Sequence, residues 1–148
     1  MVFLDTAFLK SGELCLALDH TAEADPVRGW VPAYHFNICL PDGTRIGRCD
    51  LRIGSGGKLY LGGNIGYTIF PDFRGHHYAE KACRLLFELA RRHGLPCVII
   101  TCSPDNLPSR RTCERLGGRL LEIAELPEDH DLRRDLGYTH VCVFRYEL

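Results

Sequence analysis

The sequence predicts an α+β fold, with a mixed, mostly antiparallel sheet, a central parallel βαβ unit and helices packed on the sheet. Two observations predict it. An amphipathic pattern runs from Ala79 to Ala90 between strand-like segments, and a nearly unbroken apolar run at residues 96–102 is typical of a strand buried on both faces. Because a strand, a helix and a strand follow one another within about 40 residues, the two strands are expected to be parallel.

The N-terminal half is expected to form mainly strands. Aromatic and β-branched residues are frequent in the second of these, and the turn signal Pro41-Asp42-Gly43-Thr44 joins it to the third as a hairpin. Glycines 62, 63 and 66 interrupt the fourth, which indicates a bulge or the close approach of another backbone. The expected strands are residues 13–18, 33–40, 45–53 and 59–70.

Two helices and three strands complete the expected fold. Gly94 and Pro96 should end the helix that begins near Ala79. Asp105-Asn106 can cap a second helix over residues 107–116, whose first turn tolerates Pro108. After the strand at 96–102, closing strands are expected at residues 119–124 and 138–146, with a loop at 126–137.

Composition places the chain among ordinary single-domain proteins. Its 148 residues suit one domain, 1–148, and its formal net charge of −1 argues against a nucleic-acid or membrane-surface partner. The eight cysteines show no CxxC or metal-ligand spacing, so we expect a reduced, cytoplasmic chain without a metal. No stretch approaches the roughly 18 apolar residues of a membrane span, and the N-terminus lacks the pattern of a signal peptide.

The segment from Arg74 to Ala79 carries the clearest chemical signal. An Arg-Gly step stands between a strand and a helix whose first turn has unpaired N–H groups and a partial positive charge. Gly75 lets the backbone approach a ligand, and Arg74 adds a fixed charge. Together with the amides of His76, His77, Tyr78 and Ala79, these residues predict a pyrophosphate cradle. An ordinary strand-to-helix turn with a solvated arginine is the alternative.

This segment resembles the central motif of the GNAT superfamily of acyl-CoA N-acyltransferases, R/Q-x-x-G-x-G/A, with His76 and His77 in positions that usually hold small residues. The run GNIGYTIFPDFRGHHYAEKA is similar to the branch that acetylates the N-termini of ribosomal proteins. Residues 106–118, NLPSRRTCERLGG, resemble that branch's N-x-x-S-x-R-x-x-E-x-x-G-F block, with Gly118 in place of Phe. The resemblance covers about residues 45–125.

The resemblance implies an acetyl-CoA-dependent N-acetyltransferase that acts by direct attack in a ternary complex. The acceptor would be a small-molecule or peptide amine, and the family often forms homodimers. Strands at 64–70 and 97–102 should splay apart to admit the pantetheine arm, held by backbone groups of Ile69 and Phe70. Asn106 and Ser109 should contact the coenzyme arm. Arg110, Arg111 or Arg115 either meets the nucleotide phosphate or belongs to a solvated helix face.

The catalytic residues are less clear, because two family positions differ. Asn64 stands where relatives often place a glutamate; it cannot be a base but can orient water. Cys113 stands where relatives place a tyrosine proton donor, and the alternative is a packed core cysteine. His35 could be the base or a structural histidine. Tyr78 and Tyr138 are other candidate donors, while Trp30 and Tyr34 either line the acceptor site or belong to the core.

The acceptor-binding region also departs from the family. The usual N-terminal helical pair is not visible, since residues 18–34 contain Pro26, Gly29 and Pro32 and are interpreted as a loop. The missing glutamate and tyrosine motivate an alternative function, that of a non-catalytic acyl-CoA-binding or regulatory module.

Overall fold

The computed structural model describes residues 1–148 and contains seven strands and four α-helices. The strands are β1 (Cys15–Ala22), β2 (Ala33–Cys39), β3 (Arg45–Arg52), β4 (Ile65–Ile69), β5 (Cys97–Cys102), β6 (Arg119–Glu125) and β7 (His140–Glu147). The helices are α1 (Lys58–Gly62), α2 (Tyr78–Arg92), α3 (Leu107–Arg115) and α4 (Asp131–Leu136), with a 3-10 turn, η1, at Pro71–Phe73. The α+β class is therefore confirmed.

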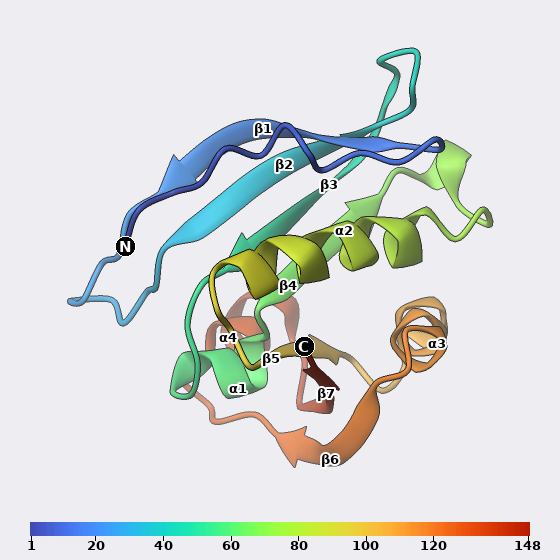
Figure 1. The fold of residues 1–148 in the computed structure, drawn as a ribbon. Helices are drawn as coiled ribbons and strands as arrows, with labels where there is room; N and C mark the ends of the chain where they lie inside the picture. The colour runs from blue at the N-terminus through green and yellow to red at the C-terminus, as the bar shows by residue number, and fades with distance from the viewer.

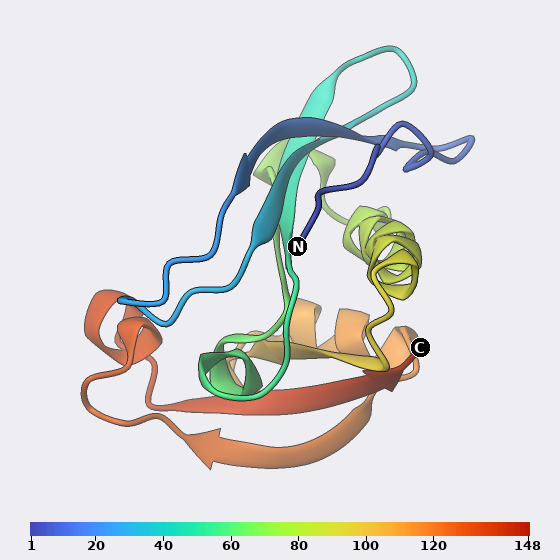
Figure 2. The same cartoon turned by 60° about the vertical axis from the view of Figure 1, so that its left-hand side comes forward.

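The strands form two antiparallel sheets. One has the order β1-β2-β3-β4 and the other the order β5-β7-β6. The sheets meet at an open angle, and α2 lies within that angle (Figures 1 and 2). Because β4 and β5 are edge strands of different sheets, the angle opens between their two unpaired edges.

The expected parallel βαβ unit is wrong in one respect: β4 and β5 form no strand ladder. The two segments touch at one end, where the Asn64 N–H donates to the Ile99 carbonyl at 2.7 Å. The Ile99 N–H donates in turn to the Asn64 side-chain Oδ1 at 2.9 Å. A side-chain amide thus occupies the place of a backbone partner, and the strands diverge beyond it. Because β4 and β5 are held together only at this end, they splay apart, as the family resemblance implies.

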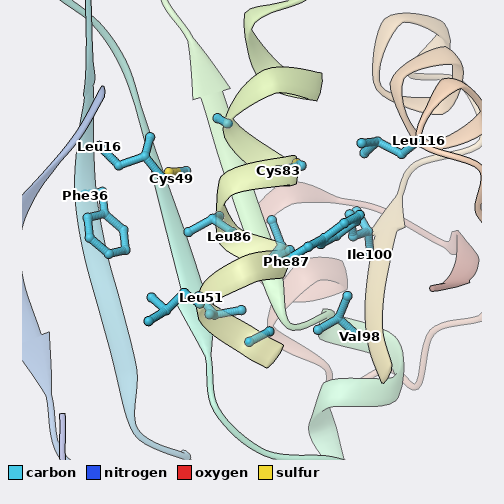
Figure 3. Close-up of a cluster of buried hydrophobic side chains, with 14 of the residues drawn as sticks. Leu16, Phe36, Cys49, Leu51, Cys83, Leu86, Phe87, Val98, Ile100 and Leu116 are labelled. Carbon is cyan, nitrogen blue, oxygen red and sulfur yellow. The ribbon is translucent and has the colours of Figure 1, made fainter. Parts of the chain in front are cut away.

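The core lies between the two sheets and is centred on α2. Leu86 is fully buried and Phe87 nearly so, and the helix presents them between opposite walls of apolar side chains (Figure 3). The four-stranded sheet and the three-stranded sheet with α3 contribute, among others, Leu16, Phe36, Cys49 and Leu51 on one side, and Val98, Ile100 and Leu116 on the other. Removing one such side chain would cost about 2–5 kcal/mol of stability.

A smaller apolar cluster covers the other face of the three-stranded sheet. Ile99 of β5 and Val143 of β7 belong to it, and side chains of α1 and α4 pack against it. Along β5, Val98 and Ile100 face the main core while Ile99 faces the second cluster. The prediction that this strand is buried on both faces is therefore confirmed.

Two short helices replace segments expected to be extended or irregular. The strand predicted over residues 59–70 is wrong in its first part, which forms α1. Glycines with positive φ stand at both ends of this helix: Gly57, with φ 53°, before it and Gly63, with φ 81°, after it. The loop predicted at 126–137 contains α4, whose N-terminus is capped by His130 and which ends at left-handed Gly137. Neither helix exceeds six residues, which is too short for helical periodicity to reveal.

The remaining expectations concern the N-terminal region, the cysteines and membrane spans. No helix lies between β1 and β2, although β1 extends through Ala22 into the segment expected to be a loop. All eight cysteines are free. None of the helices combines the length and apolar character that crossing a bilayer requires.

Candidate active site

Two cavities meet at the open edge of β4. The sheet-face cavity, of about 650 Å³, lies over polar side chains of β1–β4 and reaches β5 and α4. The helix-end cavity, of about 550 Å³, lies at the N-terminus of α2 and extends to α3. Four residues line both cavities and form their common wall: Tyr67, Thr68, Asn106 and Ser109.

The helix-end cavity gathers most of the predicted pyrophosphate cradle. Lining residues from this segment are Arg74, Gly75, His77, Tyr78 and Ala79. The amides that open α2 have no partner within the helix, because the Lys81 N–H makes its first bond, to the His77 carbonyl. The Arg74 Nε donates to the Ile69 carbonyl at 3.0 Å, which fixes its guanidinium beside the helix end. The arrangement can hold a polyanion.

Two residues of the cradle have left-handed backbone conformations. Gly75 has φ 91°, and His77, which caps α2, has φ 60°. His77 is the only residue other than glycine with positive φ, and its side chain makes no capping hydrogen bond. A residue with a Cβ pays roughly 1–2 kcal/mol for this conformation. Backbone strain is therefore located at the mouth of the cavity.

His76 lies outside the helix-end cavity. It lines a third, more open cavity that also includes Glu13 and Lys81. Its carbonyl accepts from the Lys81 Nζ at 3.4 Å, and Lys81 also forms an ion pair with Glu13. The His76 side chain therefore lies outside the cradle, and the predicted contact of its backbone amide stays a prediction.

The backbone of β4 offers one predicted contact and restricts the other. The Phe70 N–H donates to the Ile46 carbonyl at 2.9 Å, and the Phe70 carbonyl accepts from the Phe73 N–H at 2.9 Å. The Phe70 N–H is therefore already used, and only the second lone pair of its carbonyl is left for the predicted contact with pantetheine, which stays a prediction. Since N–H groups alternate sides along a strand, those of Tyr67 and Ile69 point to the open edge.

A phenol and a hydroxyl meet on the common wall. Tyr67 Oη lies 2.7 Å from Ser109 Oγ. The Asn106 side chain caps α3 by accepting from the Ser109 N–H at 3.2 Å, which positions that serine. Burial raises the pKa of Tyr67, so the phenol keeps its proton at neutral pH. Sequence reasoning missed Tyr67, although its place in the strand before the Arg-Gly step was a usable signal.

The three arginines of α3 differ in their surroundings. Arg111 is exposed, lines the helix-end cavity and forms no ion pair. Arg115 also lines the cavity, but its Nε lies 2.9 Å from the Glu80 carboxylate. Arg110 lies outside the cavity, 3.8 Å from Glu114. Arg111 is therefore the arginine of the three that can meet a second anionic group.

His35 lines the sheet-face cavity, and a carboxylate lies beside it. Its Nδ1 is 3.8 Å from Oδ2 of Asp50, and its ring stacks on His20 with centroids 4.4 Å apart. Partial burial lowers the pKa of His35, with Asp50 opposing the shift. Asp50 is held by the Gly66 N–H at 2.8 Å and by Arg52 at 3.3 Å. Sequence reasoning missed Asp50, which only the register of β2 against β3 brings to His35.

Asn64 is buried and fully hydrogen-bonded, which favours a structural role over its predicted role in orienting water. Its side chain is 2% exposed and lines neither cavity. Its Nδ2 donates to the carbonyls of Arg52 and Gly54, each at 3.0 Å, while Oδ1 accepts from Ile99. No amide hydrogen remains for a water molecule.

Cys113 lines neither cavity and is buried directly behind their walls, next to the side chains of Tyr67 and Cys102. It is fully buried on the inner face of α3, and Tyr146 donates to its carbonyl at 2.7 Å. Full burial favours the core alternative for Cys113 over a role as proton donor, which stays a prediction. Its neighbourhood includes the buried core residues Cys83 and Leu116.

Two of the four remaining aromatic candidates line a cavity and two do not. Tyr78 lines the helix-end cavity and Tyr138 the sheet-face cavity. Tyr34 is fully buried, and its hydroxyl bonds to the Leu4 N–H and to His93. Trp30 is half exposed beneath the guanidinium of Arg28 and lines neither main cavity.

Known proteins share this fold. A RimL ribosomal L7/L12 alpha-N-protein acetyltransferase, solved in complex with coenzyme A, aligns with a TM-score of 0.61 at 21% identity over 82% of this chain and 64% of its own. A GNAT-family acetyltransferase from Bacillus anthracis gives a TM-score of 0.59 at 19% identity, over 76% of this chain and 65% of its own. This chain thus spans less than two thirds of either structure.

Sequence comparison agrees with the structural likeness. The uncharacterized N-acetyltransferase YnaD of Bacillus subtilis is 32% identical over 56 residues, which is 37% of this chain and a third of YnaD. Residues 15–119, well over half of the chain, match the family described as the acetyltransferase (GNAT) domain. The chain therefore belongs to the GNAT acetyltransferase family.

Proposed function

We propose that this chain is an N-acetyltransferase that transfers an acetyl group from acetyl-CoA to a primary amine of a small molecule or peptide, with residues 1–148 acting as a single domain. One observation carries the proposal: the sheet-face and helix-end cavities share a wall at the open edge of β4. Direct transfer requires an amine and a thioester to meet from opposite sides, and two cavities with one wall provide that geometry.

The residues of the helix-end cavity fit a coenzyme A thioester. The amides opening α2 and the guanidinium of Arg74 suit the diphosphate, and Arg111 suits a further phosphate of the nucleotide. The unpaired edge of β4 suits the amide groups of a pantetheine arm, since it offers backbone donors and acceptors without a strand partner. The RimL structure was solved with coenzyme A, which supports this assignment.

His35 is the proposed general base. A lysine-like amine has a pKa of about 10.4, so a group in the site must take its proton before attack. Because burial lowers the pKa of His35, its imidazole is mostly neutral at pH 7 and can accept that proton, directly or through water. Asp50, 3.8 Å from Nδ1, stabilises the resulting imidazolium and orients the ring.

Tyr67 is the proposed proton donor to the departing sulfur. The amine nitrogen forms a bond to the acetyl carbon, the carbon–sulfur bond breaks, and the thiolate takes a proton from the Tyr67 hydroxyl. The acylated nitrogen loses its extra proton to solvent, and solvent returns a proton to the Tyr67 phenolate. Ser109, 2.7 Å away, stabilises the phenolate while Tyr67 regains a proton. The Ile69 N–H faces the open edge and is the proposed donor to the developing oxyanion. These groups replace the glutamate and tyrosine whose absence favoured a non-catalytic module.

A thiol-release assay tests the proposal. Purified protein is mixed with acetyl-CoA and a panel of small amines and peptides, and free thiol is measured together with acetylated product. We expect amine-dependent thiol release. Arg74→Ala should raise the KM for acetyl-CoA about tenfold or more, because it removes a charge-assisted contact with the coenzyme. The control Arg91→Ala lies on α2 outside both cavities and should leave the KM unchanged.

The alternative function predicts a different result. A non-catalytic module would bind acetyl-CoA in calorimetry and release no thiol with any amine of the panel. Acetyl-CoA that failed to bind at all would contradict both functions, because both depend on the helix-end cavity.

A further inference from the structure

The sheet-face cavity contains a row of three hydrogen-bond donors beside the proposed base. Antiparallel register pairs Asn37 of β2 with Arg48 of β3, and Arg48 with Thr68 of β4. Residues paired in this way point to the same face of a sheet, and all three line the cavity. The Asn37–Arg48–Thr68 row therefore presents an amide, a guanidinium and a hydroxyl side by side.

The charges of the cavity leave the guanidinium of Arg48 without a partner. The two lining carboxylates are already engaged: Asp19 with His20 at 2.5 Å and with the Asn37 amide beside it, and Asp50 with Arg52 at 3.3 Å. The Asn37 amide keeps a second N–H for a ligand. Arg48 makes no ion pair and is exposed to the cavity. A second lining arginine, at position 45, also forms no ion pair and stacks over the ring of Phe70. The cavity thus has an excess of positive charge in a protein whose net charge is −1.

The row also has a defined position relative to the proposed base. His35 pairs with Asp50, two residues along β3 from Arg48 and on the same face. Two residues of antiparallel strand span about 7 Å. A molecule whose amine lies at His35 can therefore place a group a few bonds away against Arg48.

We propose that the acceptor is a primary amine that carries an anionic group, a carboxylate or a phosphate, a few bonds from its nitrogen, and that the Asn37–Arg48–Thr68 row binds this anion. The inference rests on the proposed function for the role of His35. Arg48 supplies the charge and a planar donor pair, while Asn37 and Thr68 supply neutral hydrogen bonds on either side. Leu132, Leu136 and Tyr138 also line the cavity and supply apolar surface for the intervening carbon chain.

Matched acceptors test the inference. γ-Aminobutyrate is compared with its uncharged amide, and phosphoethanolamine with ethanolamine, so that the two pairs distinguish a carboxylate from a phosphate. We expect the anionic member of at least one pair to have a kcat/KM about tenfold or more above its neutral partner, as one charge-assisted contact provides. Arg48→Gln should abolish that preference by lowering only the value for the anionic member, whereas Arg91→Gln should preserve it.

A binding measurement makes the test independent of turnover. Calorimetry on the protein saturated with coenzyme A should show the anionic member binding more tightly than its neutral partner, and Arg48→Gln should remove the difference. Equal or weaker binding of both anionic members would overturn the inference. If neutral amines or peptides are acetylated while the Arg48→Gln variant behaves like the wild type, the acceptor class is wrong and the acetyltransferase function stands. Anion-selective binding without thiol release would instead contradict the catalytic proposal alone.

Discussion

Tyr67 Oη and Ser109 Oγ lie 2.7 Å apart, and together they connect β4 to α3 across the common wall of the two cavities. Tyr67 belongs to the edge strand of the four-stranded sheet and Ser109 to the helix that follows β5, so the contact joins the two sides of the molecule at the wall that both cavities share. In the proposed function, acetyl-CoA and the amine meet at this wall, which is where a proton donor to the leaving sulfur is needed.

The first prediction concerns this pair. Tyr67→Phe removes the hydroxyl and leaves the ring in place, so kcat should fall about 10²-fold, the lower range for loss of a positioned acid. Coenzyme affinity, measured by calorimetry, should change little. Ser109→Ala should lower kcat less than Tyr67→Phe, because the phenol itself remains. Full turnover by Tyr67→Phe would show that the thiolate receives its proton elsewhere, with Tyr138 the next candidate in the sheet-face cavity.

The parts of this site that the sequence predicts are those built from consecutive residues. The cradle from Arg74 to Ala79 depends on a strand ending, a glycine and a helix beginning, all of which are local properties. The capping role of Asn106 is equally local. Most of the strands and both long helices were also predictable, since hydrophobic periodicity reports which face of each element is buried.

The parts that the sequence does not predict depend on how distant segments pair. His35 and Asp50 become neighbours through the register of β2 against β3, and Tyr67 and Ser109 through the packing of α3 beside β4. The direction of the Phe70 N–H likewise follows from its pairing with Ile46. The structural role that the hydrogen bonds of Asn64 favour was not predictable, because a polar residue at a catalytic position and one that clamps two strands look the same in one sequence.

The second prediction separates the arginines of α3. Arg111→Ala should weaken coenzyme A binding about tenfold, because its guanidinium is free and lines the helix-end cavity. Arg110→Ala is the matched control, since that side chain faces Glu114 outside the cavity and should leave the dissociation constant unchanged. Calorimetric titration of both variants gives the comparison. Equal effects of the two substitutions would point to a general electrostatic field and would remove Arg111 as a specific contact.

The third prediction is a pH profile. Burial lowers the pKa of His35 below its ordinary 6.5, so kcat/KM for the amine should rise with pH through an apparent pKa below 6.5 and reach a plateau, once the ionisation of the amine is allowed for. Asp50 raises that pKa, so Asp50→Asn should move the rising limb to lower pH and reduce the plateau. Asp129→Asn, a change in an exposed turn, is the control. If kcat/KM rose over the same pH range in Asp50→Asn as in the wild type, the His35–Asp50 pair would be excluded as the base.

The fourth prediction concerns the clamp between the sheets. Asn64→Ala leaves the Ile99 N–H and two backbone carbonyls without their partner in a buried setting, so the free energy of unfolding should fall by about 3 kcal/mol. Thr101→Val, which removes one partly buried hydrogen bond to Leu61 in the same region, should cost only about 1 kcal/mol. Urea denaturation measures both. A stable Asn64→Ala protein that binds coenzyme A but has lost turnover would restore a catalytic role to Asn64.

The fifth prediction tests the strain at the mouth of the coenzyme cavity. His77 holds φ 60° without a capping bond, so His77→Gly should raise the free energy of unfolding by about 1 kcal/mol, because glycine adopts this conformation without a steric penalty. His76→Gly is the matched control: its φ is not positive, so added chain entropy should leave stability unchanged or lower. Gly75→Ala should destabilise by roughly 1–2 kcal/mol, since φ 91° disfavours a Cβ although the space around it is open. If His77→Gly were less stable than the wild type and also bound coenzyme A more weakly, the imidazole itself would be making a contact in the cradle. A more stable variant with unchanged affinity would show that only the backbone amide at this position faces the ligand.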